Sequence, residues 1–133
     1  MAVTDEPTTD QVATVVDAYF DALNETDPTR RAGLLAQAFV DDGAFRDPLA
    51  DLVGAEQIGA MLDAAHEAYP GQVFRRTSGI DGHHDVRRFE WNLGPADGVG
   101  DLVVAGIDIV ELAPDGRIAC VTGFFGPFPD LEA

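Results

Sequence analysis

The first half of the chain carries apolar residues at helical spacing, beginning close to the N-terminus. Thr8 and Gln11 have the spacing of a capping box, in which the side chain of each residue bonds the backbone N–H of the other. This pair predicts a helix that starts just after Thr8 and continues to about Asn24. The apolar side of that helix is made of Val12, Val15, Val16, Tyr19, Phe20 and Leu23.

Two further helices are indicated before the middle of the chain. Asp27 followed by Pro28 is typical of a helix start, and we expect this helix to end at the Asp-Asp-Gly sequence of residues 41–43. A short extended segment, residues 44–47, should follow, because the next residue is a proline and disfavours helical backbone before it. Apolar spacing resumes over residues 54–69 and predicts a third helix, which a Pro-Gly pair terminates.

The second half of the chain changes to the pattern of strands separated by glycine-containing turns. We expect four strands, over residues 72–80, 85–93, 102–112 and 117–125. The turns between them should be residues 81–82, 94–100 and 115–116. Three helices followed by an antiparallel meander predict an α+β fold, with the helices packed on one face of a curved, mainly antiparallel sheet. A chain of 133 residues suits a single domain, which we expect to span residues 1–133.

The strand expected at residues 102–112 is apolar on both faces, which is unusual for an antiparallel strand backed by solvent. One face carries Leu102, Val104, Gly106, Val110 and Leu112, and the other carries Val103, Ala105, Ile107 and Ile109. The helices can cover only one of these faces. A second subunit is the simplest cover for the other, so we expect a homodimer with Ile107 or Ile109 near the contact.

Acidic residues dominate the charge of the chain. There are 24 of them against 8 basic residues, which gives a formal net charge of −16. Nucleic acid and anionic membranes are therefore disfavoured as partners, because both require a basic face. No apolar run approaches the roughly 20 residues of a membrane span, and the N-terminus does not have the pattern of a secretory signal. The single cysteine, Cys120, cannot form an internal disulfide, so the cytoplasm is the expected location.

Asp108 is the most unusual polar residue, because it lies in the middle of the most apolar strand. The alternation of the strand places it on the same face as Val104 and Val110. Burial of a carboxylate without a partner is costly, so desolvation should raise its pKa and favour the neutral acid, which is a hydrogen-bond donor. The structural alternative is an acid that meets an arginine or a water, or that faces outward.

Asp47 and Tyr19 are the other two candidates for chemistry. Asp47 precedes Pro48, whose ring restricts the local backbone and suits a side chain held in one place. An aspartate before proline can equally cap its own turn. Tyr19 lies on the apolar side of the first helix, where it is either a core residue with a satisfied hydroxyl or a donor to a ligand.

A metal site is not expected. His83, His84 and Asp85 are residue types that bind metals, but neighbours on a strand point to opposite faces, and this segment is expected to be a solvated turn.

Three segments of the chain resemble, in matching order, segments of the bacterial ketosteroid isomerases. Residues 15–24, Val-Val-Asp-Ala-Tyr-Phe-Asp-Ala-Leu-Asn, resemble the opening helix, whose tyrosine donates to the substrate oxyanion. Residues 41–48 resemble the segment that ends in the general base and a proline. Residues 103–108 resemble the strand that bears a protonated aspartic acid. The resemblance extends from about residue 11 to residue 126.

The wider nuclear transport factor 2-like superfamily also contains SnoaL-like polyketide cyclases, which the chain resembles at least as much. Residues 88–91, 115–118 and 123–125 are similar to its uncharacterised members. The resemblance implies a cone-shaped α+β barrel around an apolar pocket. Gly106 stands where the isomerases have proline, and the connection between the candidate tyrosine and base is longer. The chain can therefore share the pocket of the isomerases and still act on a substrate that is not a steroid.

The resemblance also implies a mechanism. Asp47 would be the general base that removes a proton next to a carbonyl group, and Tyr19 and Asp108 would donate to the enolate oxygen, as known for ketosteroid isomerases. The implied partner is a small apolar or carbonyl-containing ligand, and no cofactor is required. The residues expected to bind it are Phe20, Phe89, Trp91, Val104 and Phe124.

Two functions remain open on the sequence. The first is a proton-transfer enzyme, either an isomerase or a cyclase. The second is a non-catalytic ligand-binding or dimerisation module of the same fold. The joint presence of Tyr19, Asp47 and Asp108 favours the enzyme, and the test is whether their side chains meet at one apolar cavity.

Overall fold

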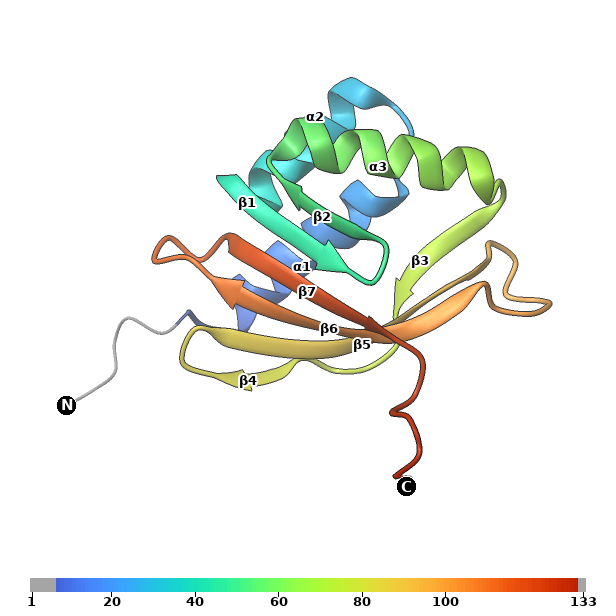
Figure 1. The fold of residues 1–133 in the computed structure, drawn as a ribbon. Coiled ribbons are helices and arrows are strands. Elements are labelled where there is room, and N and C mark those ends of the chain that lie inside the picture. Colours follow the sequence, from blue (N-terminus) through green and yellow to red (C-terminus); the bar gives the residue numbers. More distant parts are fainter. Residues whose placement is uncertain (1–6, 132–133) are drawn as a thin grey trace.

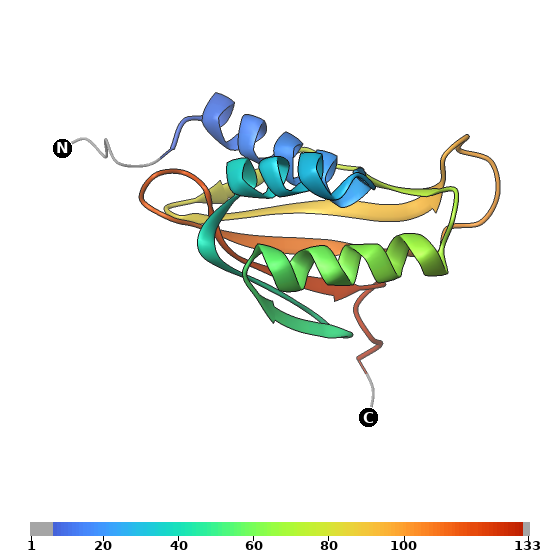
Figure 2. The same ribbon diagram turned by 90° about the horizontal axis from the view of Figure 1, so that it is seen from above.

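The computed structural model describes residues 7–131, and its three helices lie on one face of a curved sheet (Figure 1 and Figure 2). The predicted capping box is confirmed: Thr8 Oγ1 accepts from the Gln11 N–H, and Gln11 Oε1 accepts from the Thr8 N–H. Asp27 and Pro28 start the second helix as predicted. The helices are α1 (Thr9–Asn24), α2 (Pro28–Ala38) and α3 (Ala55–Ala68).

Within residues 7–131, seven strands form one sheet in the order β2-β1-β7-β6-β5-β3, with β4 beside β5. All neighbouring strands run antiparallel except β1 and β7, which are parallel. The fold is therefore α+β with a curved, mainly antiparallel sheet, as predicted, but the described sheet is open rather than a closed barrel. The strands are β1 (Phe39–Asp47), β2 (Ala50–Val53), β3 (Gln72–Arg76), β4 (Asp81–His83), β5 (Val86–Pro95), β6 (Val104–Leu112) and β7 (Ile118–Phe125).

The second helix is shorter than predicted, and the extended segment after it is longer. α2 ends at Ala38, and Phe39 already belongs to β1, where it pairs with Ile118 of β7. The Arg117 guanidinium donates to the Ala36 and Phe39 carbonyl oxygens at 3.0 Å and satisfies acceptors at the helix end. This contact joins the end of α2 to a side chain 81 residues beyond Ala36, which a local pattern does not reveal.

The strands of the second half also differ in detail from the expected ones. The strand expected at residues 72–80 is shorter than predicted, because β3 ends at Arg76. A separate short strand, β4, begins at Asp81. Residues 81–82 therefore belong to a strand, and the turn lies at residues 84–85, where His84 adopts a φ of 55°. The short strand β2 was not predicted, since its four residues are too few to show a clear alternation.

The core lies between the helices and the concave face of the sheet. Val16 and Leu62 enter it from α1 and α3, and Val110, Ile118 and Val121 enter it from the strands, all fully buried. Burial of one such side chain stabilises the folded state by about 1.5–3 kcal/mol relative to leaving it exposed. The core adjoins the cavity that is described below, and some of its residues line that cavity.

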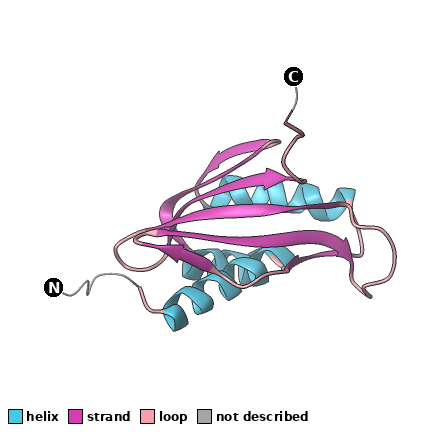
Figure 3. Ribbon diagram, turned by 90° about the horizontal axis from the view of Figure 1, so that it is seen from below, coloured by secondary structure: helices cyan, strands magenta, loops and turns pink. Residues whose placement is uncertain are grey.

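The outer face of the sheet is also apolar along β6, as the two-faced strand predicted. We call Ala105, Ile107, Ile109 and Phe124 the outer apolar patch; Phe124 of β7 lies opposite Ile107 and is 53% exposed. Figure 3 shows the helices on the far side of the sheet, so no helix of the described residues covers this patch. The homodimer that would cover it remains a prediction.

Candidate functional site

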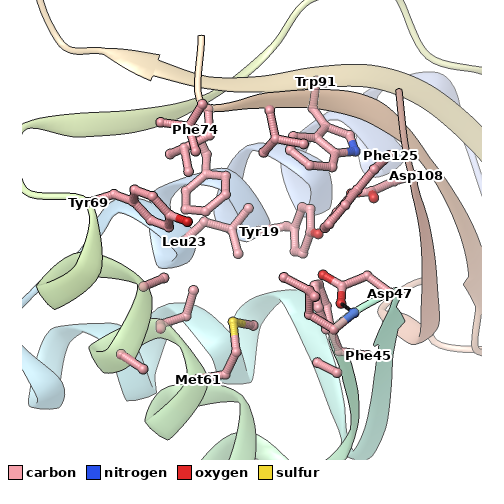
Figure 4. Close-up of a pocket in the computed structure, with 18 residues that line it drawn as sticks. Tyr19, Leu23, Phe45, Asp47, Met61, Tyr69, Phe74, Trp91, Asp108 and Phe125 are labelled. Carbon is pink, nitrogen blue, oxygen red and sulfur yellow. Dashed lines mark hydrogen bonds between the residues drawn. The ribbon is translucent and has the colours of Figure 1, made fainter. Parts of the chain in front are cut away.

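An apolar cavity of about 520 Å³ lies between the helices and the concave face of the sheet (Figure 4). Its wall combines side chains from α1 and α3 with side chains from six strands. The apolar part of the wall includes Leu23, Phe45, Met61, Phe74, Leu93 and Phe125. A cavity of this size and lining suits a small, mostly apolar molecule.

The structure brings the three candidate residues to this one cavity. Tyr19 comes from α1, Asp47 from the end of β1 and Asp108 from the middle of β6, and all three line the wall. Figure 4 shows their oxygen atoms on the same side of the cavity. The convergence expected of an active site is therefore present, whereas the catalytic roles of the three residues stay predictions.

Tyr19 and Asp108 form a buried pair. The Tyr19 hydroxyl donates to Asp108 Oδ2 at 2.8 Å, and the two residues are only 2% and 4% exposed. Burial raises the pKa of Asp108 to about 7; the hydrogen bond from Tyr19 opposes this rise, and the nearby charge of Asp47 adds to it. Burial and the Asp108 charge likewise raise the pKa of Tyr19 well above its usual value. At neutral pH this pair can therefore present a neutral carboxylic acid as well as a phenol.

Asp47 has a different environment. It is half-buried, and its Oδ1 accepts a hydrogen bond from the backbone N–H of Leu49 at 2.9 Å. This is the turn-capping bond that the Asp-Pro sequence suggested as an alternative to catalysis. The bond also holds the carboxylate at the cavity wall, so the turn and the site use the same side chain.

Gly123 separates the two carboxyl groups. It lies opposite Asp108 in β7, and the parallel pairing of Arg46 with Thr122 brings Asp47 beside it. A Cβ atom at Gly123 would lie 2.9 Å from Asp108 Oδ1 and 3.4 Å from Asp47 Cβ. The glycine therefore allows the two acids to lie close to the same strand, because any side chain at this position would press on Asp108. A glycine inside a strand often marks such a close approach, and this signal could have drawn attention to Gly123, which the sequence analysis did not single out.

The residues expected to bind the ligand divide into two groups. Trp91 and Val104 line the cavity, and their contact with a ligand stays a prediction. Phe20, Phe89 and Phe124 do not, which corrects the expectation for these three.

The physical reason differs between the three phenylalanines. Phe20 and Phe89 lie in the core beside Tyr19, with ring centroids 5.2 and 6.3 Å from its ring, so they hold the tyrosine rather than the ligand. Phe124 follows Gly123 in β7 and so points to the opposite face, in the outer apolar patch.

The cavity mouth carries exposed apolar side chains that the sequence did not single out. Leu49 in the turn after β1 is 85% exposed, and Tyr69 at the end of α3 and Val103 before β6 are also exposed. Tyr69 lines the cavity and remains open to solvent. Apolar side chains around an opening favour the entry of an apolar molecule.

Over residues 7–131, no three His, Cys, Asp or Glu side chains lie close enough together to hold a metal ion. His83 and His84 contact each other through their Nδ1 atoms at 2.9 Å in an exposed turn. In the same part of the chain, no helix is both long enough and apolar enough to cross a bilayer.

The curved sheet, the three helices on its concave face and the enclosed cavity define a protein with the nuclear transport factor 2-like fold, also described as cystatin-like. The profile of the SnoaL-like domain matches residues 16–121. The chain belongs to the SnoaL-like family.

Solved structures similar to this chain include proteins with provisional assignments. A SnoaL-like protein from Agrobacterium tumefaciens, provisionally assigned as an isomerase, is 38% identical, and the match covers 89% of this chain and 99% of that chain with a TM-score of 0.78. A provisionally assigned polyketide cyclase from Sinorhizobium meliloti is 20% identical over 88% and 99% of the two chains, with a TM-score of 0.65. A cystatin-like protein of unknown function from Methylobium petroleophilum is 20% identical over 96% and 84%, with a TM-score of 0.72. None of the curated proteins compared with the chain matches it.

Proposed function

We propose that this protein is a cofactor-free enzyme that moves a proton next to a carbonyl group of a small, mostly apolar substrate. The observation that carries the proposal is the arrangement of two unlike acids in one apolar cavity. Asp108 is buried and bonded to Tyr19, whereas Asp47 is half-buried and lies on the other side of Gly123. Two carboxyl groups in unlike environments are the usual basis for separate acid and base roles.

In this proposal Asp47 is the general base. Its carboxylate would take a proton from the carbon next to the carbonyl group and return it to another position of the substrate. The hydrogen bond from the Leu49 N–H supports this role, because it restricts the carboxylate to one orientation. The net reaction would be an isomerisation, with no atom gained or lost.

Tyr19 and Asp108 would stabilise the negative charge that develops on the substrate oxygen. They bond to each other in the structure, and a substrate oxygen arriving beside them would accept a hydrogen bond from each, with the Tyr19 hydroxyl turning from Asp108 to the substrate. Donors that are already oriented in a dry site commonly contribute a few kcal/mol each to transition-state stabilisation. Asp108 must be neutral to donate, which its raised pKa of about 7 supports below that pH.

The same groups could close a ring by an intramolecular aldol reaction, in which the carbanion attacks a second carbonyl group. The names of the Agrobacterium and Sinorhizobium proteins, an isomerase and a polyketide cyclase, are consistent with either outcome. An isomerase needs only one carbonyl group, and it is the function we test.

The test compares turnover with ligand binding. The substrate is a small β,γ-unsaturated ketone, and the ligand is a phenol, which resembles the enolate. Asp47→Asn should lower turnover by about 10²–10⁴-fold, because the base is lost, and should leave phenol binding intact. Asp51→Asn is the matched control, since this exposed carboxylate of β2 does not line the cavity, and it should keep full activity.

Changes to the donors should show the opposite pattern. Tyr19→Phe and Asp108→Ala should each weaken phenol binding by several-fold to about tenfold, since each removes one hydrogen bond to the phenol oxygen. Turnover of the wild-type protein should fall as the pH rises through about 7, because Asp108 then loses the proton it donates. If Asp47→Asn and Asp108→Ala change phenol binding equally, the proposed division of roles is wrong.

A ligand-binding module without catalysis is the second candidate. The observation in its favour is that Asp47 Oδ1 is already used by the turn, so the carboxylate has a structural role that needs no substrate. This candidate predicts that the wild-type protein binds phenols and related apolar molecules but turns over no β,γ-unsaturated ketone.

The partner and the location belong to the same proposal. The outer apolar patch supports a homodimer, because an exposed apolar surface on a sheet is commonly covered by a second subunit. The net charge of −16 argues against nucleic acid and anionic membrane as partners. The single cysteine supports a reducing cytoplasm as the location.

A further inference from the structure

Trp91 carries a buried donor that the proposed mechanism does not use. Its indole Nε1 is shielded from solvent and has no hydrogen-bond partner among residues 7–131. Buried N–H groups in folded proteins nearly always have a partner, either in the protein or in a bound molecule. An unsatisfied donor on the wall of a cavity therefore points to an acceptor in the ligand.

The position of Trp91 is determined by the strands around it. Trp91 in β5 lies opposite Gly106 in β6. A Cβ atom at Gly106 would lie 3.0 Å from Trp91 Cζ2, so the lack of a side chain at this position leaves room for the indole ring. The ring packs against Phe74 and Phe125, with centroids 6.3 and 5.9 Å away. These contacts hold the indole in one orientation along the cavity wall.

The nitrogen edge of this ring lies toward Asp108 (Figure 4). Nε1 is close enough to lower the pKa of the Asp108 carboxyl, but the two groups do not have the geometry of a hydrogen bond. Asp108 Oδ2 already accepts the Tyr19 hydroxyl. The three donor groups are therefore gathered at one place, and the indole N–H has no acceptor with the geometry of a hydrogen bond.

We propose that the indole N–H of Trp91 donates a hydrogen bond to the oxygen atom of the ligand, as a third donor beside Tyr19 and Asp108. This inference rests on the proposed function, because it assumes that the ligand oxygen binds at the Tyr19–Asp108 pair. It makes the cavity selective for ligands with a strongly accepting oxygen, such as an enolate or a phenolate. A simple apolar molecule of the same shape would leave the indole donor unpaired.

The first test observes the N–H directly. Trp91 is the single tryptophan of the chain, so a proton–nitrogen correlation spectrum contains one indole signal, which needs no assignment. Phenol should move this proton signal downfield, as expected for a new hydrogen bond, and toluene, which has a similar shape but no oxygen, should not. An equal response to both molecules, or no response to a phenol that binds, would overturn the proposal.

The second test removes the donor but keeps an aromatic ring. Trp91→Phe should weaken phenol binding by several-fold to about tenfold, the usual cost of losing one hydrogen bond. Toluene binding should not weaken, so the ratio of the two affinities isolates the N–H from changes in packing. The spectrum of the wild-type protein decides the question if this variant does not fold.

The outcomes also separate this inference from the proposed function. If Tyr19→Phe weakens phenol binding while Trp91→Phe does not change the ratio of phenol affinity to toluene affinity, the proposed role of Trp91 is wrong. The proposed roles of Tyr19 and Asp108 are then unaffected. If the wild-type protein binds phenol no better than toluene, there is no oxygen site, and both proposals fail.

Discussion

The buried carboxyl of Asp108 should make the stability of the protein depend on pH in a way that a single substitution can isolate. Burial raises the folded-state pKa of Asp108 from 3.8 to about 7. The folded protein therefore binds this proton more tightly than the unfolded chain does. Between about pH 4 and pH 7 the folded state holds the proton while the unfolded chain releases it, so the free energy of unfolding falls as the pH rises.

The size of this effect follows from the pKa difference. About three pKa units correspond to roughly 4 kcal/mol, because one unit is worth 1.36 kcal/mol. The contribution is complete below about pH 4, is lost progressively as the pH rises toward 7, and stays lost above it. A loss of this size is a large part of the 5–15 kcal/mol by which domains are commonly stable.

The assay compares the wild-type protein with Asp108→Asn. Asparagine cannot titrate, but its Oδ1 can still accept the Tyr19 hydroxyl, so the hydrogen bond of the pair is kept. Urea unfolding measured at about pH 5 and at about pH 8 should show the wild-type protein losing about 2–3 kcal/mol relative to the variant, because about two pH units separate pH 5 from the folded-state pKa of about 7. Other titrating groups are common to both proteins and cancel in the difference. If the stability difference between the two proteins is the same at both pH values, Asp108 does not hold a raised pKa, and the neutral-donor role loses its basis.

Two further substitutions test the arrangement of the sheet. Gly123→Ala should destabilise the protein by about 1–3 kcal/mol in urea unfolding, because the new Cβ would lie 2.9 Å from Asp108 Oδ1 and disturb the hydrogen bond between Tyr19 and Asp108. Gly33→Ala is the control: its new Cβ would meet no neighbouring side chain within 4 Å, and it should stabilise α2 by about 1 kcal/mol. Equal effects of the two would mean that Gly123 is not needed for space. Ile107→Glu should convert the expected homodimer to a monomer in light scattering, while Thr29→Glu, an exposed site on α2, should not; a monomeric wild-type protein would contradict the dimer.

The sequence by itself determined the local elements of this protein. The capping box at Thr8 and Gln11 and the Asp-Pro sequence at residue 27 set the starts of two helices, because these signals act within one turn of backbone. Alternation along the chain indicated the strands β5, β6 and β7 and singled out Asp108 as an acid on an inward face. The resemblance to known families then linked it to Tyr19 and Asp47.

Tertiary structure decided how these elements meet. The parallel pairing of β1 with β7 brings Asp47 beside Gly123 and across from Asp108, and it depends on contacts between segments more than 70 residues apart. The end of α2 was mispredicted for the same reason, since Phe39 pairs with Ile118 of β7 and the distant Arg117 donates to the Ala36 and Phe39 carbonyl oxygens.

The sequence also did not determine which side chains line the cavity. Phe20, Phe89 and Trp91 are all large, apolar and inward, and the sequence does not distinguish those that support Tyr19 from the one that reaches the cavity. That difference arises from the curvature of the sheet and from the space left at Gly106 and Gly123, where each strand lacks a side chain. Periodicity determines the face on which a residue lies, whereas the neighbours across the strands determine what that face meets.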